Sequence, residues 1–201
     1  MKTTLKKLAY SGLTVLTIGV LAACSSTSSS STSSSSSSAT VTNTSNNSST
    51  SSSTSSSVDW SSLPTTEVSL TNEGLTITEG GTYILTGTTT GGVTVETDAN
   101  VRIILAGATI SSSDTAAINV ISAGTVEIEL QDGTENTVKD SSTHSNTDIE
   151  GAIHVEADLI ISGNGSLTVE GNFQDGIVST DNLTINAGNI TVTAADDGIR
   201  G

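Results

Sequence analysis

The feature that most limits the fold of this chain is a recurring unit of three short apolar strands. Ile153, Ile177 and Ile199 occupy equivalent positions in successive units, at a period of roughly 22–25 residues. Each unit consists of β-branched runs separated by Gly, Asn and Asp, and helical spacing is nowhere sustained after Val58. A three-strand unit with this period is typical of a parallel β-helix in which each unit forms one coil.

The repeat extends toward the N-terminus with one interruption. Val93 and Ile118 are separated by one such period, whereas the spacing from Ile118 to Ile153 is longer by about ten residues. Residues 139–150 account for the longer spacing, because they are polar and have no strand pattern. We therefore predict a loop inserted into one coil.

The predicted fold is all-β, a right-handed parallel β-helix of about 22–25 residues per coil. Alternation places Ile153 and Val155 inside and His154 outside. Equivalent residues of neighbouring coils then lie about 4.8 Å apart. A β-sandwich is the competing fold, because its short strands are also separated by closely and regularly spaced turn signals.

Residues 1–24 predict export and a lipid anchor. Lys2, Lys6 and Lys7 precede an apolar run over 8–21 that is too short to span a bilayer comfortably. The run ends before Cys24 in a sequence that resembles the lipobox of bacterial lipoproteins. The resemblance implies a signal peptide over 1–23 and a lipidated Cys24, which would anchor the exported protein to the cell membrane. An ordinary signal peptide that contains a cysteine is the alternative.

Residues 24–57 predict a disordered linker, and residues 58–201 a folded domain. Apart from Cys24, the linker contains Ser, Thr and Asn with Ala39 and Val41, so it cannot bury enough apolar area to offset its ordering entropy. The domain carries 21 acidic and three basic residues, a net charge of −18. Such a surface repels phosphate backbones and excludes nucleic acid as a partner. The single cysteine excludes a disulfide scaffold.

Acidic residues of successive coils align where one coil passes to the next. Carboxylates on adjacent coils can share an ion, because calcium takes oxygen ligands at roughly 2.3 to 2.6 Å. The sequence therefore predicts a calcium site. Asp before Gly is also a common turn former, which explains the same residues without a metal. The predicted ligands are Glu150, Asp175, Asp196 and Asp197.

Several short motifs recur in a fixed order in the domain. They are Asn136-Thr137, Gly151-Ala152-Ile153, Gly163-Asn164-Gly165-Ser166-Leu167-Thr168-Val169, Asp175-Gly176-Ile177 and Ala194-Ala195-Asp196-Asp197-Gly198-Ile199-Arg200-Gly201. With them, residues 67–201 resemble a family of bacterial carbohydrate-binding-domain proteins. The resemblance implies a calcium-containing parallel β-helix that binds polygalacturonic acid and cellulose. Family members continue for more coils, and here another coil begins at Asp197 without a cap. We therefore expect a fragment of a longer protein, or partner chains that cover the end.

The expected ligand is an acidic polysaccharide such as pectin or polygalacturonate. Few aromatic rings are present to stack on sugars: Trp60, Tyr83 and Phe173 in the domain. Trp60 is predicted to mark the start of the domain or to cover its N-terminal end, whereas the role of Phe173 stays open. Three basic residues cannot build a direct site for a polyanion, so bound calcium or polar contacts must mediate.

Catalysis is the second hypothesis, because pectate lyases and polygalacturonases are also β-helices. Of the polygalacturonase motifs only Asn146-Thr147-Asp148 and Asp196-Asp197 are present, and the first lies in the predicted loop. A lyase needs a basic group beside the substrate carboxylate. Arg200 is predicted to be a surface charge, His144 lies in the loop, and His154 faces outward without a partner. We therefore expect a binding protein that is not an enzyme. The third hypothesis is a structural adhesin or wall spacer without a specific sugar ligand.

Overall fold

The computed structural model describes residues 58–201. This part of the chain consists of β-strands and one short 3-10 turn, η1 (Trp60–Ser62). No helix in the described part is long and apolar enough to cross a membrane. The predicted signal peptide over 1–23, the lipidation site at Cys24 and the linker over 24–57 lie outside the described residues.

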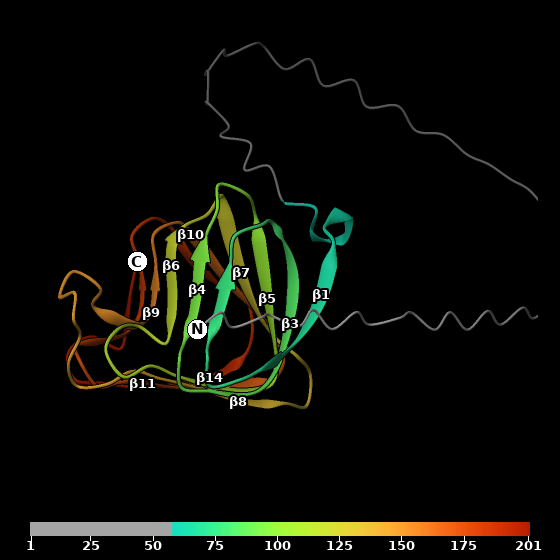
Figure 1. Ribbon diagram of the computed structural model, residues 1–201. Helices are drawn as coiled ribbons and strands as arrows, with labels where there is room; N and C mark the ends of the chain where they lie inside the picture. Colours follow the sequence, from blue (N-terminus) through green and yellow to red (C-terminus); the bar gives the residue numbers. More distant parts are fainter. Residues whose placement is uncertain (1–57) are drawn as a thin grey trace, which may run out of the picture. The chain divides into compact units, whose positions relative to one another are not determined.

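The strands form two curled sheets that enclose a common core (Figure 1). The nine-stranded sheet consists of β1 (Thr65–Leu70), β3 (Gly81–Thr89), β5 (Val101–Ser111), β7 (Thr125–Leu130), β8 (Glu135–Lys139), β10 (Asp158–Gly163), β11 (Ser166–Gly171), β13 (Leu183–Ile185) and β14 (Asn189–Ala194). The six-stranded sheet consists of β2 (Leu75–Ile77), β4 (Val93–Glu96), β6 (Ile118–Ser122), β9 (Gly151–Val155), β12 (Asp175–Ser179) and β15 (Ile199–Arg200).

The nine-stranded sheet bends along β5 and so provides two of the three faces around the core. Residues 101–105 of β5 pair with β7, whereas residues 109–111 pair with β8. Between them, Gly107 has a φ of +85°, a left-handed conformation that glycine adopts without strain. Figure 1 shows the result, with β5 and β7 running upright and β8, β11 and β14 crossing below them.

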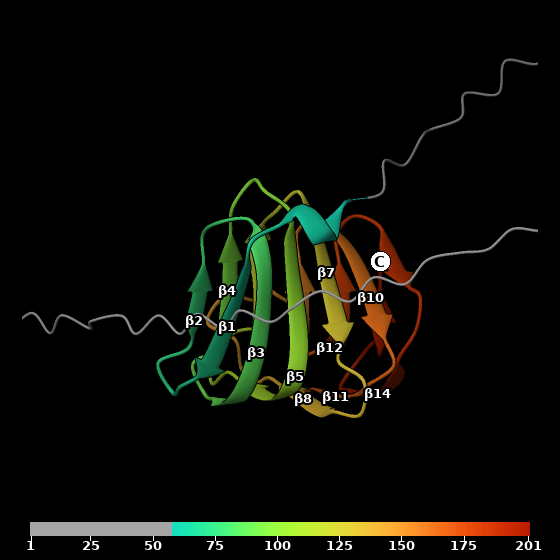
Figure 2. The ribbon, with the colours of Figure 1, turned by 90° about the vertical axis from the view of Figure 1, so that its right-hand side faces the viewer.

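The strand register confirms the predicted superposition of the repeats. In the six-stranded sheet Ile118 pairs with Ile153, Ile153 with Ile177, and Ile177 with Ile199. Every strand pair in residues 58–201 is parallel. A sandwich of antiparallel sheets is therefore wrong for this chain. The fold is all-β, with parallel strands in curled sheets like those of a β-helix, and Figure 2 shows β3, β5, β7 and β10 side by side.

Apolar side chains from all three faces fill the interior in vertical stacks. Ile118, Ile153 and Ile177 are fully buried, as alternation predicts. Two positions that the same alternation places inside, Ile185 and Ile199, are 43% and 44% exposed. They belong to β13 and β15, which within the described residues have a paired strand on one side alone. These two side chains therefore have a stacked neighbour on one side, whereas Ile77 on the other edge strand, β2, is still buried.

A buried asparagine fixes the corner between β5 and β8. The side-chain oxygen of Asn136 accepts hydrogen bonds from the N–H groups of Gly107 and Ala108, each at 2.9 Å. Its side-chain nitrogen donates to the carbonyl of Ser166 at 3.1 Å and to the hydroxyl of Thr134 at 3.0 Å. Asn136 therefore satisfies buried backbone groups that the bend of the sheet leaves without strand partners.

Truncation of a stacked isoleucine tests the role of the core. We expect Ile153→Ala to lower the free energy of unfolding by about 2–5 kcal/mol, because the side chain is fully buried between two coils. Thr184→Ala, on an exposed position of β13, is the control and should change it by about 0.5 kcal/mol. Urea unfolding followed by circular dichroism measures both, and equal losses would contradict the stacked core.

Candidate functional site

The predicted calcium ligands lie at the corner where successive coils enter the six-stranded sheet. Asp175 pairs with Gly151 of the preceding coil, and the backbone N–H of Asp197 donates to Oδ1 of Asp175 at 3.0 Å. The side chain of Asp175 is 1% exposed, whereas Asp196 and Asp197 are exposed. We call Glu150, Asp175, Asp196 and Asp197 the carboxylate cluster. The structure confirms that these residues come from stacked coils.

An arginine lies between two of these carboxylates. Nη1 of Arg200 is 3.2 Å from Oδ2 of Asp175, and its Nη2 forms an ion pair with Oε2 of Glu150. The guanidinium is 44% exposed, as predicted for a surface charge, but it has specific partners on two earlier coils. The backbone N–H of Asp196 donates to the carbonyl of Gln174 at 2.8 Å. The structure thus joins Glu150 and Asp175 through Arg200.

These residues do not fit a calcium ion while Arg200 is in place. Calcium takes six to eight oxygen ligands. Here Oδ1 of Asp175 already accepts a hydrogen bond, and Oδ2 faces a fixed positive charge. Within the part of the chain that the structure describes, no group of three or more His, Cys, Asp or Glu residues is placed to hold a metal.

The carboxyl group of Asp175 is in an environment that opposes its ionisation. Burial raises the pKa of Asp175, and the nearby charges of Asp197 and Asp196 raise it further. The hydrogen bond from the N–H of Asp197 lowers the pKa, but burial has the larger effect. The ion pair with Arg200 favours the charged form of this carboxylate.

The predicted inserted loop packs over the outer side of the six-stranded sheet. We call residues 140–150 the covering loop. The backbone N–H of Glu150 in this loop donates to Nδ1 of His154 at 3.3 Å, and His154 is 4% exposed. His154 lies on the outer side of the sheet, as alternation predicts, but the expectation that it has no partner is wrong, because the covering loop buries it. Burial lowers the pKa of His154, and His144 lowers it further, while Glu156 and Asp175 act in the opposite direction.

A second histidine holds the covering loop in place. His144 stacks on Phe173, with ring centroids 4.3 Å apart and an interplanar angle of 21°. Its Nε2 is 3.0 Å from Oδ2 of Asp140, and its Nδ1 bonds to the carbonyl of Ile149. Both side chains of the His144–Asp140 pair are fully buried. Phe173, whose role the sequence left open, therefore packs against the covering loop.

The outer surface of β8, β11 and β14 carries a column of threonines. Register places Thr88 beside Thr109, and Thr109 beside Thr137. Thr137 pairs with Thr168, which in turn pairs with Thr191. We call these five residues the threonine column. Four are exposed and Thr137 is half-buried. Each hydroxyl can both donate and accept a hydrogen bond.

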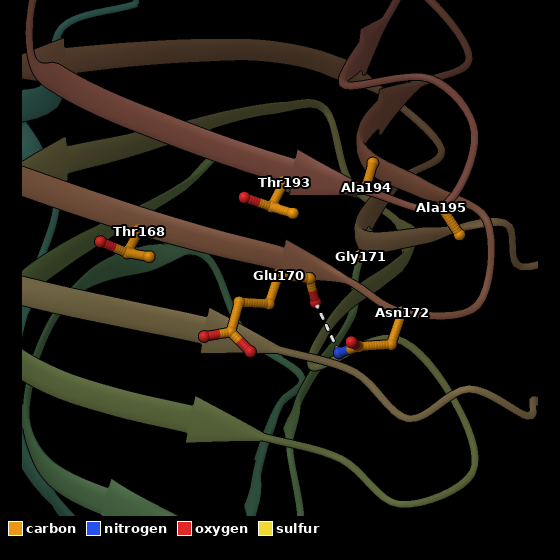
Figure 3. Close-up of a pocket in the computed structure, with 7 residues that line it drawn as sticks. All are labelled: Thr168, Glu170, Gly171, Asn172, Thr193, Ala194 and Ala195. Carbon is orange, nitrogen blue, oxygen red and sulfur yellow. Dashed lines mark hydrogen bonds between the residues drawn. The ribbon is translucent and has the colours of Figure 1, made fainter.

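Two shallow hollows lie along this column. One, shown in Figure 3, has a volume of about 400 Å³. It is lined by Thr168, Glu170, Gly171, Asn172, Thr193, Ala194 and Ala195. The other has a volume of about 320 Å³. It is lined by Glu135, Asn136, Thr137, Ser166, Leu167, Thr168, Asn189 and Thr191. Such volumes are in the lower range of small-molecule sites. Both hollows share Thr168, so they adjoin each other on this face.

The sequence also contains a pattern that indicates this face, separate from the pattern of acidic residues. Thr137, Thr168 and Thr191 each precede valine in equivalent strands. Their valines point inward and their threonines outward, since side chains alternate along a strand. The aligned acidic residues indicated a site at one corner of the molecule, whereas the aligned threonines mark one of its faces.

Comparisons with known proteins identify a family described as carbohydrate-binding and a solved structure of similar fold. The family described as carbohydrate-binding domain-containing protein matches residues 71–201. A protein of Acetivibrio thermocellus with the same description is 34% identical over 135 residues, 63% of this chain and 47% of the relative. The chain thus spans about half the length of that curated relative.

A solved structure supports the same relationship. It is described as the polysaccharide lyase-like protein from C. thermocellum, gadolinium derivative. It is 30% identical to this chain with a TM-score of 0.60, over 65% of this chain and 61% of the other.

The burial of His154 predicts that the stability of the domain depends on pH. The unfolded chain binds a proton near pH 6.5, whereas the folded chain binds it at lower pH. The stability that His154 contributes is therefore complete above about pH 6.5 and is lost as the pH falls through this window. We expect wild type to lose stability relative to His154→Gln as the pH falls from roughly 7.5 to 5.5.

Urea unfolding at both pH values measures this difference. The pKa of Asp175 is shifted in the opposite direction, and both proteins retain this residue. A constant difference between the two proteins across the window would contradict the assignment of a neutral, buried imidazole.

Proposed function

Because the chain belongs to the family of carbohydrate-binding domain-containing proteins, we propose that it binds an acidic polysaccharide of the polygalacturonate kind at the cell surface. In this proposal a right-handed β-helix of about 22–25 residues per coil presents the binding face. The observation that carries the proposal is the threonine column with its two hollows. The alternative of a spacer without a sugar ligand has no use for such a face.

The geometry of the threonine column suits an extended polymer. Equivalent threonines on neighbouring coils repeat at about 4.8 Å, so a chain lying across the strands meets a hydroxyl at each coil. The column itself is uncharged, and the adjacent Lys139 and Glu170 neutralise each other in an ion pair of 2.6 Å. Hydroxyls on both partners can then form hydrogen bonds without burying a charge.

We include calcium in the proposed binding mode for an electrostatic reason. The domain has a net charge of −18, and a polyuronate is also negative. Two polyanions repel unless cations lie between them. We propose that calcium supplies this bridging charge, and we assign no described residues as its ligands.

The geometry favours binding over catalysis. His144 and His154 have buried side chains, so neither is placed to exchange a proton with a polysaccharide. Arg200 is paired with Glu150 and Asp175. The lyase-like description of the structural relative favours catalysis as the second candidate. A lyase forms an unsaturated uronide, which absorbs ultraviolet light, whereas a binding protein retains the polymer without product.

Retention on insoluble pectate tests the proposed face. We expect Thr168→Val together with Thr191→Val to weaken retention of the full chain by about 5- to 150-fold, since each of the two lost hydrogen bonds contributes about 0.5–1.5 kcal/mol. Thr184→Val, exposed on β13 of another face, is the matched control and should bind as wild type does.

Two further arms of the same assay separate the hypotheses. A chelator should abolish retention if calcium bridges the charges, and equal retention with and without it rejects calcium bridging. An increase in ultraviolet absorbance would identify a lyase. A protein that shows neither retention on pectate nor a product would be a spacer. Equal weakening by the column variants and Thr184→Val would reject the threonine face.

We also propose that Cys24 carries the lipid that holds the chain at the membrane. It is the one cysteine of the chain, so Cys24→Ser removes the lipid acceptor without a competing site. We expect this variant to move from the membrane to the soluble fraction of fractionated cells, while Ser25→Ala stays with the membrane. A variant that remains in the membrane fraction would contradict lipidation at Cys24.

A further inference from the structure

The covering loop is bonded to the wall of the hollow shown in Figure 3. Asn172, which lines the hollow, directly follows β11, and Asp140 of the covering loop directly follows β8 on the neighbouring coil. We infer that the hollow recognises sugar hydroxyl groups through the side-chain oxygen of Asn172, and that Asp140 holds this oxygen in position. The inference rests on the proposed function and names the group of the polysaccharide that the hollow takes.

The side-chain amide of Asn172 has one orientation. Its Nδ2 donates to the backbone carbonyl of Asp140 at 2.9 Å and to that of Glu170 at 3.2 Å, the second bond being dashed in Figure 3. Both carbonyl oxygens need a donor, so the nitrogen cannot exchange places with Oδ1. Oδ1 accepts no hydrogen bond within residues 58–201, and Asn172 is exposed. The wall of the hollow therefore presents an acceptor to a ligand.

Asp140 also fixes the backbone of Asn172. Oδ1 of Asp140 accepts the backbone N–H of Asn172 at 2.5 Å. The side chain of Asp140 is fully buried, and its Oδ2 lies 3.0 Å from Nε2 of His144. His144 stacks on Phe173, the residue after Asn172. The covering loop thus holds the backbone and the side chain of Asn172 before a ligand arrives, which reduces the entropy lost on binding.

The polar groups of the hollow determine which part of a sugar it can take. Besides Asn172, the side chains of Thr168, Glu170 and Thr193 line it, and the carboxylate of Glu170 is paired with Lys139. A sugar hydroxyl can donate a hydrogen bond to Oδ1 of Asn172. A carboxylate has acceptors alone, so it would place one acceptor against another. The amide oxygen therefore selects the hydroxyls of a polyuronate.

Retention of the full chain on insoluble pectate, before and after partial acetylation of the ring hydroxyls, tests the inference. We expect Asn172→Ala to weaken retention on unmodified pectate by about 2- to 13-fold, as for the loss of one hydrogen bond. The difference from wild type should shrink on acetylated pectate, because fewer hydroxyls can donate to Oδ1. A purely structural role of Asn172 predicts an equal loss on both polymers, and that result would overturn the inference.

Asn182→Ala is the matched control. The backbone N–H and Nδ2 of Asn182 bond to Oδ1 of Asp158 at 3.2 Å and 2.8 Å, so this asparagine also joins two coils. It is exposed just before β13 and lines neither hollow. We expect its retention to equal that of wild type on both polymers, and a loss like that of Asn172→Ala would contradict a role specific to the hollow.

Asp140 is a positioning residue, so its variants should act through Asn172. We expect Asp140→Ala to weaken retention, and to add no further loss to Asn172→Ala. Asp140→Asn keeps an oxygen that can accept the N–H of Asn172, and should restore retention. Additive losses, or no rescue by Asp140→Asn, would overturn the positioning role. If Asp140→Ala does not fold, Asp140→Ser takes its place, because serine keeps a polar group but has one side-chain oxygen instead of two.

The same assay separates this inference from the proposed function. If wild type is not retained on pectate, the proposed function fails and the inference fails with it. If wild type is retained and Thr168→Val with Thr191→Val weakens binding while Asn172→Ala does not, the inference alone fails.

Discussion

The structure depends on the register between parallel coils. Stacking of equivalent strands provides the backbone hydrogen bonds of both sheets and aligns the apolar side chains into columns. Because side chains alternate with a period of two, a slip by one residue would turn every inward isoleucine outward. The same register decides which polar residues meet, since Asp175 reaches Asp197, and Thr168 reaches Thr191, through neighbouring coils.

Positive charges are few in this domain, and they form ion pairs between coils. Residues 58–201 contain Arg102, Lys139 and Arg200 as their basic side chains. Each forms an ion pair with glutamate or aspartate of another coil. Exposed pairs such as Lys139 with Glu170 contribute little, about 0–1 kcal/mol. The pair between Arg200 and Asp175 differs, because the aspartate is buried. Intramolecular pairing thus engages the cations that could have attracted a polyanion directly.

The outer surfaces of the molecule have different physical characters. The loop over 140–150, which His144 and Phe173 hold in place, covers the outer side of the six-stranded sheet at β9. Across the core, the face of β8, β11 and β14 stays open and presents hydroxyls in a regular column. An open and periodic column of hydroxyls suits a polymer of repeating sugars better than the buried histidines suit a reaction.

The sequence determined the strand repeat, the alignment of Asp175 with Asp197 and an inserted loop, which it placed at residues 139–150 although Lys139 ends β8. These follow from periodicity, and the period of a stacked fold is written into the chain itself. The tertiary structure alone decided that His154 is buried, that Phe173 stacks on His144 and that Arg200 pairs with Glu150 and Asp175. Those contacts depend on where a loop folds back and on how a long side chain reaches a neighbouring coil. Neither leaves a periodic pattern in the sequence. The physical reason is that local patterns encode which residues face outward, whereas only packing decides what covers them.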